Sequence, residues 1–213
     1  MGLIRERPEI GDSIPAYTIG SSTTLLIVGL GNVGDRYDGT RHNIGFECVD
    51  ALASSQGFDS WITKRDLKCH ITSTTIGGNK VILCKPTTLM NLSGESVQAV
   101  MNFYKIPAGK VLVVHDELDI DFGLIRTRIG GGSAGHNGIK SVTQHCGEAY
   151  GRMRVGIGPK VPEQIDSADF VLSKFKSTEQ SNIKNLLQES TAILTEYIHT
   201  GGSLTPDSRS FLL

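Results

Sequence analysis

The stretch LLIVGLGNVGDRYDGTRHNIG, residues 25–45, is the most informative part of the chain for its fold, because apolar residues lead directly into glycines 29, 31 and 34. This G-x-G-x-x-G spacing is typical of dinucleotide sites, where the third glycine opens a helix that receives the pyrophosphate. Here the residues after Gly34 are polar, Gly39 interrupts them, and no helical apolar pattern begins before Ile44. The stretch therefore predicts a strand end followed by a long polar loop.

The composition indicates a single globular domain. The chain has 213 residues, of which 38% are hydrophobic and 20% charged, and its apolar runs are too short to span a bilayer. The four cysteines lack zinc-binding and C-x-x-C spacing, so we expect core thiols in a reducing cytosol. Residues 1–22 contain no apolar segment of a secretory signal, and we expect an N-terminal extension at 1–22 and a catalytic domain at 23–213.

Apolar periodicity predicts alternating strands and helices. We expect strands at 23–30, 68–76, 80–84, 111–115, 124–129 and 152–157, with a Gly77-Gly78-Asn79 hairpin between the second and third. We expect helices at 44–55, 93–104 and 177–200, the second of them closed by Pro107-Ala-Gly. This alternation predicts an α/β fold: a single domain with a mixed, mostly parallel twisted sheet flanked by helices on both faces.

Charge is segregated along the chain although the net charge is only −1. Residues 126–160 contain six basic side chains and one acid, whereas residues 161–213 contain four basic side chains and seven acids. A local basic excess of this kind is either a set of solvated strand and loop charges or a nucleic-acid contact.

Polar residues gather where the predicted strands end, which is where open α/β sheets bind ligands. The candidates are His42, Asp116, Asn32, Asn91 and Asn137, together with backbone amides freed by glycines 130–132. Each has an ordinary alternative, since aspartate is common in turns and asparagine is common at helix N-caps. As a set, however, they could hydrolyse a carbonyl compound. A carboxylate would fix the tautomer of a histidine that takes a proton from water, and amides would hold the carbonyl oxygen.

The chain has neither a G-x-S-x-G nor an H-E-x-x-H motif, which disfavours a serine acyl-enzyme and zinc hydrolysis of the common types. A water-activating His/Asp pair remains the favoured chemistry.

Five motifs in order, GLGNVG…TRHNIG, KPTTLMNLSG, HDELD, GGGSAGHNG and RVGIG, run from about Leu25 to the final helix. With them the chain resembles the bacterial-type peptidyl-tRNA hydrolases. The resemblance implies hydrolysis of the ester between a peptide and the terminal ribose of tRNA, with no metal or other cofactor. It implies peptidyl-tRNA as the partner, contacted at the acceptor end and the 5′-phosphate. We expect a cytoplasmic monomer that does not bind membranes.

The resemblance also implies roles for individual residues. His42 matches the catalytic base, Asp116 the acid that steadies it, and Asn32 the residue that senses the blocked amino group of the peptide. Substrate-binding positions match Tyr37, Leu89, Met90, Asn91, His136 and Asn137, and a basic pair for the 5′-phosphate matches Arg128 and Arg154. Several positions depart from the usual family pattern. Val33 replaces a proline, Leu89 stands where many members have an aromatic side chain, and Ser133-Ala134 replaces a commoner glycine-rich pair.

Two other functions are compatible with parts of the sequence. The first is a catalytically idle module that binds tRNA or ribosomal RNA through the basic segment. The His/Asp/Asn set argues against it, because RNA binding does not require a histidine beside a carboxylate. The second is a nucleotide-dependent oxidoreductase, which the missing helix after Gly34 disfavours.

Overall fold

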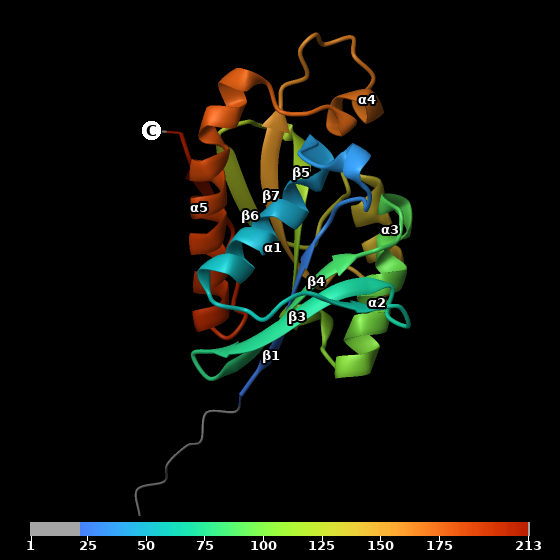
Figure 1. Ribbon diagram of the computed structural model, residues 1–213, viewed down its shortest axis with the longest axis vertical. Helices are drawn as coiled ribbons and strands as arrows, with labels where there is room; N and C mark the ends of the chain where they lie inside the picture. The colour runs from blue at the N-terminus through green and yellow to red at the C-terminus, as the bar shows by residue number, and fades with distance from the viewer. Residues whose placement is uncertain (1–21, 213) are drawn as a thin grey trace, which may run out of the picture.

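The computed structural model describes residues 22–212, so the predicted N-terminal extension lies, apart from its last residue, outside the described part of the chain. One eight-stranded sheet with the order β2-β3-β4-β1-β5-β7-β6-β8 forms the centre of the molecule (Figure 1). Its strands are β1 (Thr24–Gly29), β2 (Ile62–Lys64), β3 (Cys69–Ile76), β4 (Asn79–Pro86), β5 (Val111–Asp121), β6 (Leu124–Ile129), β7 (Gly151–Gly158) and β8 (Asp207–Ser210).

Strand direction confirms the predicted mixed sheet. The central strands β4, β1, β5 and β7 are parallel, and the pairs toward both edges are antiparallel. The β3–β4 hairpin turns at Gly77-Gly78, as predicted, although Asn79 already belongs to the second strand.

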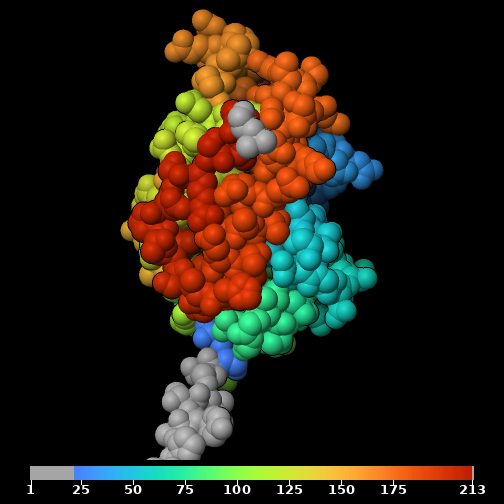
Figure 2. Space-filling model, turned by 90° about the vertical axis from the view of Figure 1, so that its left-hand side faces the viewer, coloured from blue at the N-terminus to red at the C-terminus, as the bar shows by residue number. Residues whose placement is uncertain are grey.

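Helices cover both faces of this sheet. They are α1 (Ile44–Ser55), α2 (Ser93–Tyr104), α3 (Asn137–Cys146), α4 (Ser167–Leu172) and α5 (Ser177–His199). Helices α1 and α5 pack together over one face, as Figure 2 shows, and α2 and α3 pack over the other, so two apolar cores form. No helix within residues 22–212 combines the length and the apolar character needed to cross a membrane.

The glycines of the opening stretch allow close packing of α1 against the sheet. A Cβ atom on Gly45 would lie 2.5 Å from the backbone oxygens of Leu30 and Val114, and one on Gly29 would lie 2.3 Å from the oxygen of Gly45. Gly34 has a φ of 113°, which an L side chain rarely adopts. The residues that follow it form two 3₁₀ turns, η1 (Asp35–Tyr37) and η2 (Arg41–Asn43), before α1 begins. The first α-helix after Gly34 is therefore α1, which begins at Ile44 as predicted.

Strand β5 is longer than predicted, and this corrects the placement of Asp116. It was expected to end at His115, with Asp116 in a following loop, but it continues to Asp121. The reason is that β7 continues beside it, pairing Asp116 with Val155, after β1 has ended opposite Val114. Asp116 therefore projects from a strand with paired neighbours rather than from a loop.

Other differences are smaller. Helix α2 ends at Tyr104, as predicted, but Lys105 closes it in the left-handed conformation, with φ of 55°, before Pro107 is reached. Helices α3 and α4 and the edge strands β2 and β8 were not predicted. Helix α4 and the two strands have between three and six residues, and the apolar side chains of α3 are few, namely Ile139, Val142 and Cys146.

Candidate active site

A pocket of about 460 Å³ lies beyond the carboxyl end of β1 and beside the second half of β5. Its lining comes from the loop after β1, from β5, from the start of α3 and from α4. The lining residues are Asn32, Tyr37, His42, Asp116, Glu117, Leu118, Ala134, Gly135, His136, Asn137, Ser167, Ala168, Val171 and Leu172. The structure thus brings together four of the five polar residues that the strand-end pattern singled out.

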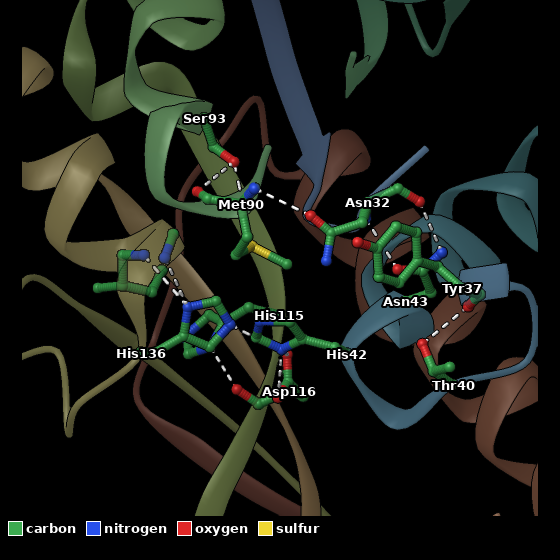
Figure 3. Close-up of polar contacts among 12 residues, drawn as sticks. Asn32, Tyr37, Thr40, His42, Asn43, Met90, Ser93, His115, Asp116 and His136 are labelled. Carbon is green, nitrogen blue, oxygen red and sulfur yellow. Dashed lines mark hydrogen bonds and ion pairs between the residues drawn. The ribbon is translucent and has the colours of Figure 1, made fainter. Parts of the chain in front are cut away.

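His42 and Asp116 form a hydrogen-bonded pair (Figure 3). The Nδ1 atom of His42 lies 2.9 Å and 3.0 Å from the two carboxylate oxygens of Asp116. Because an ionised carboxylate only accepts hydrogen bonds, Nδ1 carries the proton, and in the neutral ring Nε2 keeps a lone pair. Among the described residues Nε2 has no hydrogen-bond partner, and the ring borders the pocket. A neutral imidazole in this orientation can accept a proton from a molecule in the pocket.

His136 holds the same carboxylate from the other side. It caps helix α3, and its Nδ1 accepts the backbone N–H groups of Gly138 at 3.1 Å and Ile139 at 3.3 Å. Because Nδ1 is an acceptor, the ring proton is on Nε2, which donates to Asp116 Oδ1 at 3.0 Å. The predicted substrate-binding histidine therefore has both ring nitrogens engaged within the protein, although its ring also borders the pocket.

The environment of Asp116 keeps this carboxyl ionised. Its side chain is only 2% exposed, and burial by itself would raise its pKa. The positive charge that His136 and His42 carry when protonated, and the hydrogen bonds that they donate, outweigh burial and hold the pKa of Asp116 well below its ordinary value. Both histidines consequently face a permanent negative charge at neutral pH.

His42, Asp116 and His136 are also spaced closely enough to hold a metal ion, since their ligand atoms lie within 4.8 Å of one another. The hydrogen bonds on His136 argue against this use. A metal on Nε2 would require both ring nitrogens to be unprotonated, because Nδ1 already accepts two backbone N–H groups. A neutral imidazole carries one N–H, so the donor set fits a hydrogen-bonded carboxylate better than a metal centre.

Asn32 is held in one orientation by backbone groups. Its side-chain Oδ1 accepts the N–H of Met90 at 2.9 Å, which identifies this atom as the oxygen and leaves Nδ2 as the free donor (Figure 3). The Asn43 side chain bonds both the N–H and the C=O of Asn32, at 2.8 Å and 2.9 Å. Because Asn32 borders the pocket, the structure offers an oriented N–H₂ group to a bound molecule.

Two further titratable residues of β5 lie at the site. His115 is 1% exposed, its Nδ1 lies 2.7 Å from the backbone oxygen of Asp116, and its ring packs edge-on against His136 with centroids 4.9 Å apart. Burial, reinforced by the neighbouring His136, lowers the pKa of His115 well below its ordinary value. Glu117 borders the pocket, and burial, followed by the charge of Asp119, raises its pKa.

Of the other predicted substrate residues, some line the pocket and others lie outside it. Tyr37 and Asn137 border the pocket, and the Tyr37 hydroxyl accepts a hydrogen bond from Arg36 at 2.6 Å. Leu89 and Asn91 are exposed at the 3₁₀ turn η3 (Met90–Leu92) and are not part of the pocket lining. The Met90 side chain is buried in the core below them, so this residue reaches the site through its backbone N–H.

The predicted basic pair lies on one face of the sheet. In the antiparallel β6–β7 register Arg126 is opposite Arg154, and Arg128 is opposite Arg152, so the four side chains share a face. Arg152 is buried, whereas Arg128 and Arg154 are half-buried, and Arg128 Nε donates to the oxygen of Gly130 at 2.8 Å. Burial, followed by the charge of Arg128, lowers the pKa of Arg154, as expected for cations that lie close together.

Sequence reasoning missed Asn43, Glu117 and the pocket wall formed by α4. Asn43 and Glu117 lie inside the motifs TRHN and HDELD, so their presence beside His42 and Asp116 was the available signal. The α4 wall carries no comparable signal, because it follows the loop at 159–166 and its pocket-facing residues are small or apolar.

Three comparisons place these features among known proteins. The family model described as peptidyl-tRNA hydrolase matches residues 26–208. A peptidyl-tRNA hydrolase from Sinorhizobium fredii is 48% identical over 164 residues, which cover 76% of this chain and 67% of the relative. A peptidyl-tRNA hydrolase from Rickettsia bellii is 46% identical over 155 residues, covering 73% and 83%. The crystal structure of peptidyl-tRNA hydrolase from Acinetobacter baumannii is 37% identical, with a TM-score of 0.72 and coverage of 84% and 93%.

Proposed function

The chain belongs to the peptidyl-tRNA hydrolase family and hydrolyses peptidyl-tRNA, and from this premise we propose that His42, held by Asp116, activates the attacking water without a metal. The observation that carries the proposal is the contact of His42 Nδ1 with both Asp116 oxygens, which leaves Nε2 available at the pocket. We assign this catalytic unit to residues 23–213.

In the first step the water oxygen forms a bond to the ester carbonyl carbon, and the water proton moves to His42 Nε2. The ring then carries a positive charge, which the buried carboxylate of Asp116 stabilises. The carbonyl oxygen gains negative charge at the same time, and the Nδ2 group of Asn32 donates a hydrogen bond to it. In the second step the ester C–O bond breaks, and the proton on His42 passes to the departing ribose oxygen.

The substrate has two parts, and we assign them to two surfaces. The pocket takes the peptide, since its lining combines polar groups at the ester with the apolar side chains of Leu118, Val171 and Leu172. Arg128 and Arg154 contact the 5′-phosphate of the tRNA, because guanidinium groups bind phosphate through paired hydrogen bonds. We propose that the protein acts as a monomer, and a substrate produced by translation supports action in the cytoplasm.

The test is release of labelled peptide from purified peptidyl-tRNA by the wild type and by His42→Ala, with and without a chelator. We expect the variant to lose about 10² to 10⁴ in turnover, because this is what a positioned base contributes, while its affinity for tRNA stays within about threefold. Chelator should leave the wild-type rate unchanged. A His42→Ala variant that retains more than about a tenth of wild-type turnover would show that another group is the base.

A further inference from the structure

Arg41 is a buried cation next to His42 in the chain. Its side chain is 1% exposed, and its guanidinium carbon lies 4.5 Å from the ring centroid of Phe170 and 4.8 Å from that of Phe175. Its terminal nitrogens donate to the two oxygens of Glu179 at 3.1 Å and 2.6 Å. The planar group is therefore held by two aromatic faces and by one bidentate carboxylate.

The partners of Arg41 belong to the segment that forms the far wall of the pocket. Phe170 lies in α4, Phe175 lies in the connection to α5, and Glu179 lies in the first turn of α5. The backbone makes the same connection, since Arg41 N donates to the oxygen of Ser173 at 3.0 Å. Through these contacts the turn that carries His42 is joined to a segment about 130 residues later in the chain.

One face of helix α4 packs against Arg41, and the other face borders the pocket. Phe170 packs inward against Arg41 and is 3% exposed, whereas Ser167, Ala168, Val171 and Leu172 border the pocket. A shift of the guanidinium relative to Phe170 would therefore move the pocket wall relative to His42. The distance between the base and this wall is not set by the sheet, because α4 lies outside it and follows the loop at 159–166.

We propose that Arg41 is a positioning residue that sets the separation between His42 and the α4 wall and thereby selects the peptide side chain accepted beside the ester. This inference rests on the proposed function in one respect, namely that the peptide occupies the pocket. It assigns Arg41 no contact with the substrate. Glu179 and Phe170 act with Arg41, the first by fixing the guanidinium and the second by transmitting its position to α4.

A purely structural role for Arg41 makes a different prediction. Loss of its contacts would then lower the stability of the protein but would affect all peptides equally at temperatures where the variant is folded. A positioning role predicts a change in the preference between peptides. The decisive measurement is therefore the ratio of kcat/KM for two substrates that share one tRNA and differ only in the residue esterified to it.

Glu179→Gln is the first variant for this measurement. Glutamine has nearly the same size, and its side-chain oxygen can still accept the N–H of Lys176, which Glu179 accepts at 2.6 Å at the start of α5. It loses the charge that holds Arg41. Glu196→Gln is the matched control, because this acid also lies on α5 and pairs with an arginine, Arg209, at 2.5 Å but is not part of the pocket lining.

The substrates carry glycine or phenylalanine at the ester. We expect Glu179→Gln to lower the phenylalanine-to-glycine ratio of kcat/KM by at least about threefold, and Glu196→Gln to leave it unchanged. Phe170→Leu is a second variant, in which the Arg41–Glu179 pair stays intact. It should also lower the phenylalanine-to-glycine ratio of kcat/KM. If Glu179→Gln does not fold, Phe170→Leu decides the question.

An unchanged ratio in the folded variants would overturn the proposal, even if their melting temperatures fall. That result differs from failure of the proposed function, which would appear as retained turnover in His42→Ala on both substrates. The two tests can therefore fail independently.

Discussion

Asp116 Oδ1 accepts a hydrogen bond from His136 Nε2 at 3.0 Å, and the donor ring is itself locked by two backbone N–H groups at the start of α3. His136 is therefore fixed as a donor to Asp116, and the carboxylate that orients His42 is held by the fold on its opposite side. Removing His136 should loosen Asp116 and, through it, His42.

His136 could act by holding Asp116 or by binding the substrate, and kinetics of a variant distinguish these two roles. For His136→Ala we expect kcat to fall by about tenfold or more with little change in KM, because a hydrogen bond to a charged group contributes about 1.5–3 kcal/mol. Steady-state kinetics on peptidyl-tRNA measure both constants. If His136 instead binds substrate, as the sequence suggested, KM should rise while kcat changes less. Asn137→Ala, at the neighbouring pocket residue, is the control for a substrate contact.

The variant Asn32→Asp tests whether the side-chain N–H₂ group of Asn32 donates a hydrogen bond to the substrate. The Met90 N–H would still find a carboxylate oxygen, so the local structure should persist, but the free donor becomes a negatively charged oxygen. We expect kcat to fall by about 10² or more, the loss measured when one such donor is removed from a developing oxyanion. The matching change Asn102→Asp, at an exposed residue of α2 that is not part of the pocket lining, should leave kcat within about twofold. Equal losses in both variants would contradict an oriented donor at position 32.

Stability should depend on pH through two groups of β5. The pKa of His115 is depressed by burial, so it stays neutral in the folded state while an unfolded histidine gains a proton below about pH 6.5. The unfolded state then binds more protons, and the free energy of unfolding falls as the pH drops through this value. The pKa of Asp116 is also depressed, so its contribution is present above about pH 3.9 and is lost as the pH falls further.

Urea unfolding at a series of pH values measures this dependence. His115→Asn should reduce the slope between about pH 6.5 and 4.5 by up to about 1.4 kcal/mol per pH unit, the value for one proton. His70→Asn is the comparison, because burial also lowers the pKa of this half-buried histidine, but less strongly. A slope that is the same in the wild type and His115→Asn would mean that His115 is not the group responsible.

Much of the fold could be predicted because apolar periodicity reflects burial. The bounds of α1, α2 and β6 match the predicted ranges, since each has a clear apolar pattern and a polar or glycine-containing boundary. The extension of β5 could not be predicted, because HDELD is polar. Those residues stay in the sheet only because β7 pairs with them, and pairing between distant strands leaves no local pattern.

The site was predictable as a set of residues but not as a network. The sequence predicts His42 and Asp116 at the ends of two strands, which suggests a pair, and the structure places the two side chains in contact. The second partner of Asp116 could not be derived, because His136 caps a short helix that the sequence did not predict. Arg41 gave no signal at all, since its carboxylate partner lies 138 residues away.

The basic face of β6 and β7 gives the last prediction. Arg128 and Arg154 lie on one side of the sheet with Arg126 and Arg152, and the β6–β7 register makes Arg128 and Arg154 diagonal neighbours. Four cations on one face repel one another, which an anionic partner would relieve, and the lowered pKa of Arg154 is consistent with this crowding. Solvated strand charges would lose little when two of them are removed. A phosphate contact would lose more, and its loss would depend on salt.

For Arg128→Ala combined with Arg154→Ala we expect KM for full-length peptidyl-tRNA to rise and its salt dependence to flatten by about one log unit per lost phosphate contact. A short substrate without the tRNA body should be hydrolysed at the wild-type rate, because His42 and Asp116 lie on other elements. Replacement of Lys174 and Lys184 by alanine removes the same charge from the acidic C-terminal part of the chain and should change neither KM nor its salt dependence. Equal loss of activity on short and full-length substrates would mean that the two arginines support the Gly130–Gly132 loop and that the tRNA is bound elsewhere. Arg128 already contacts this loop through the oxygen of Gly130.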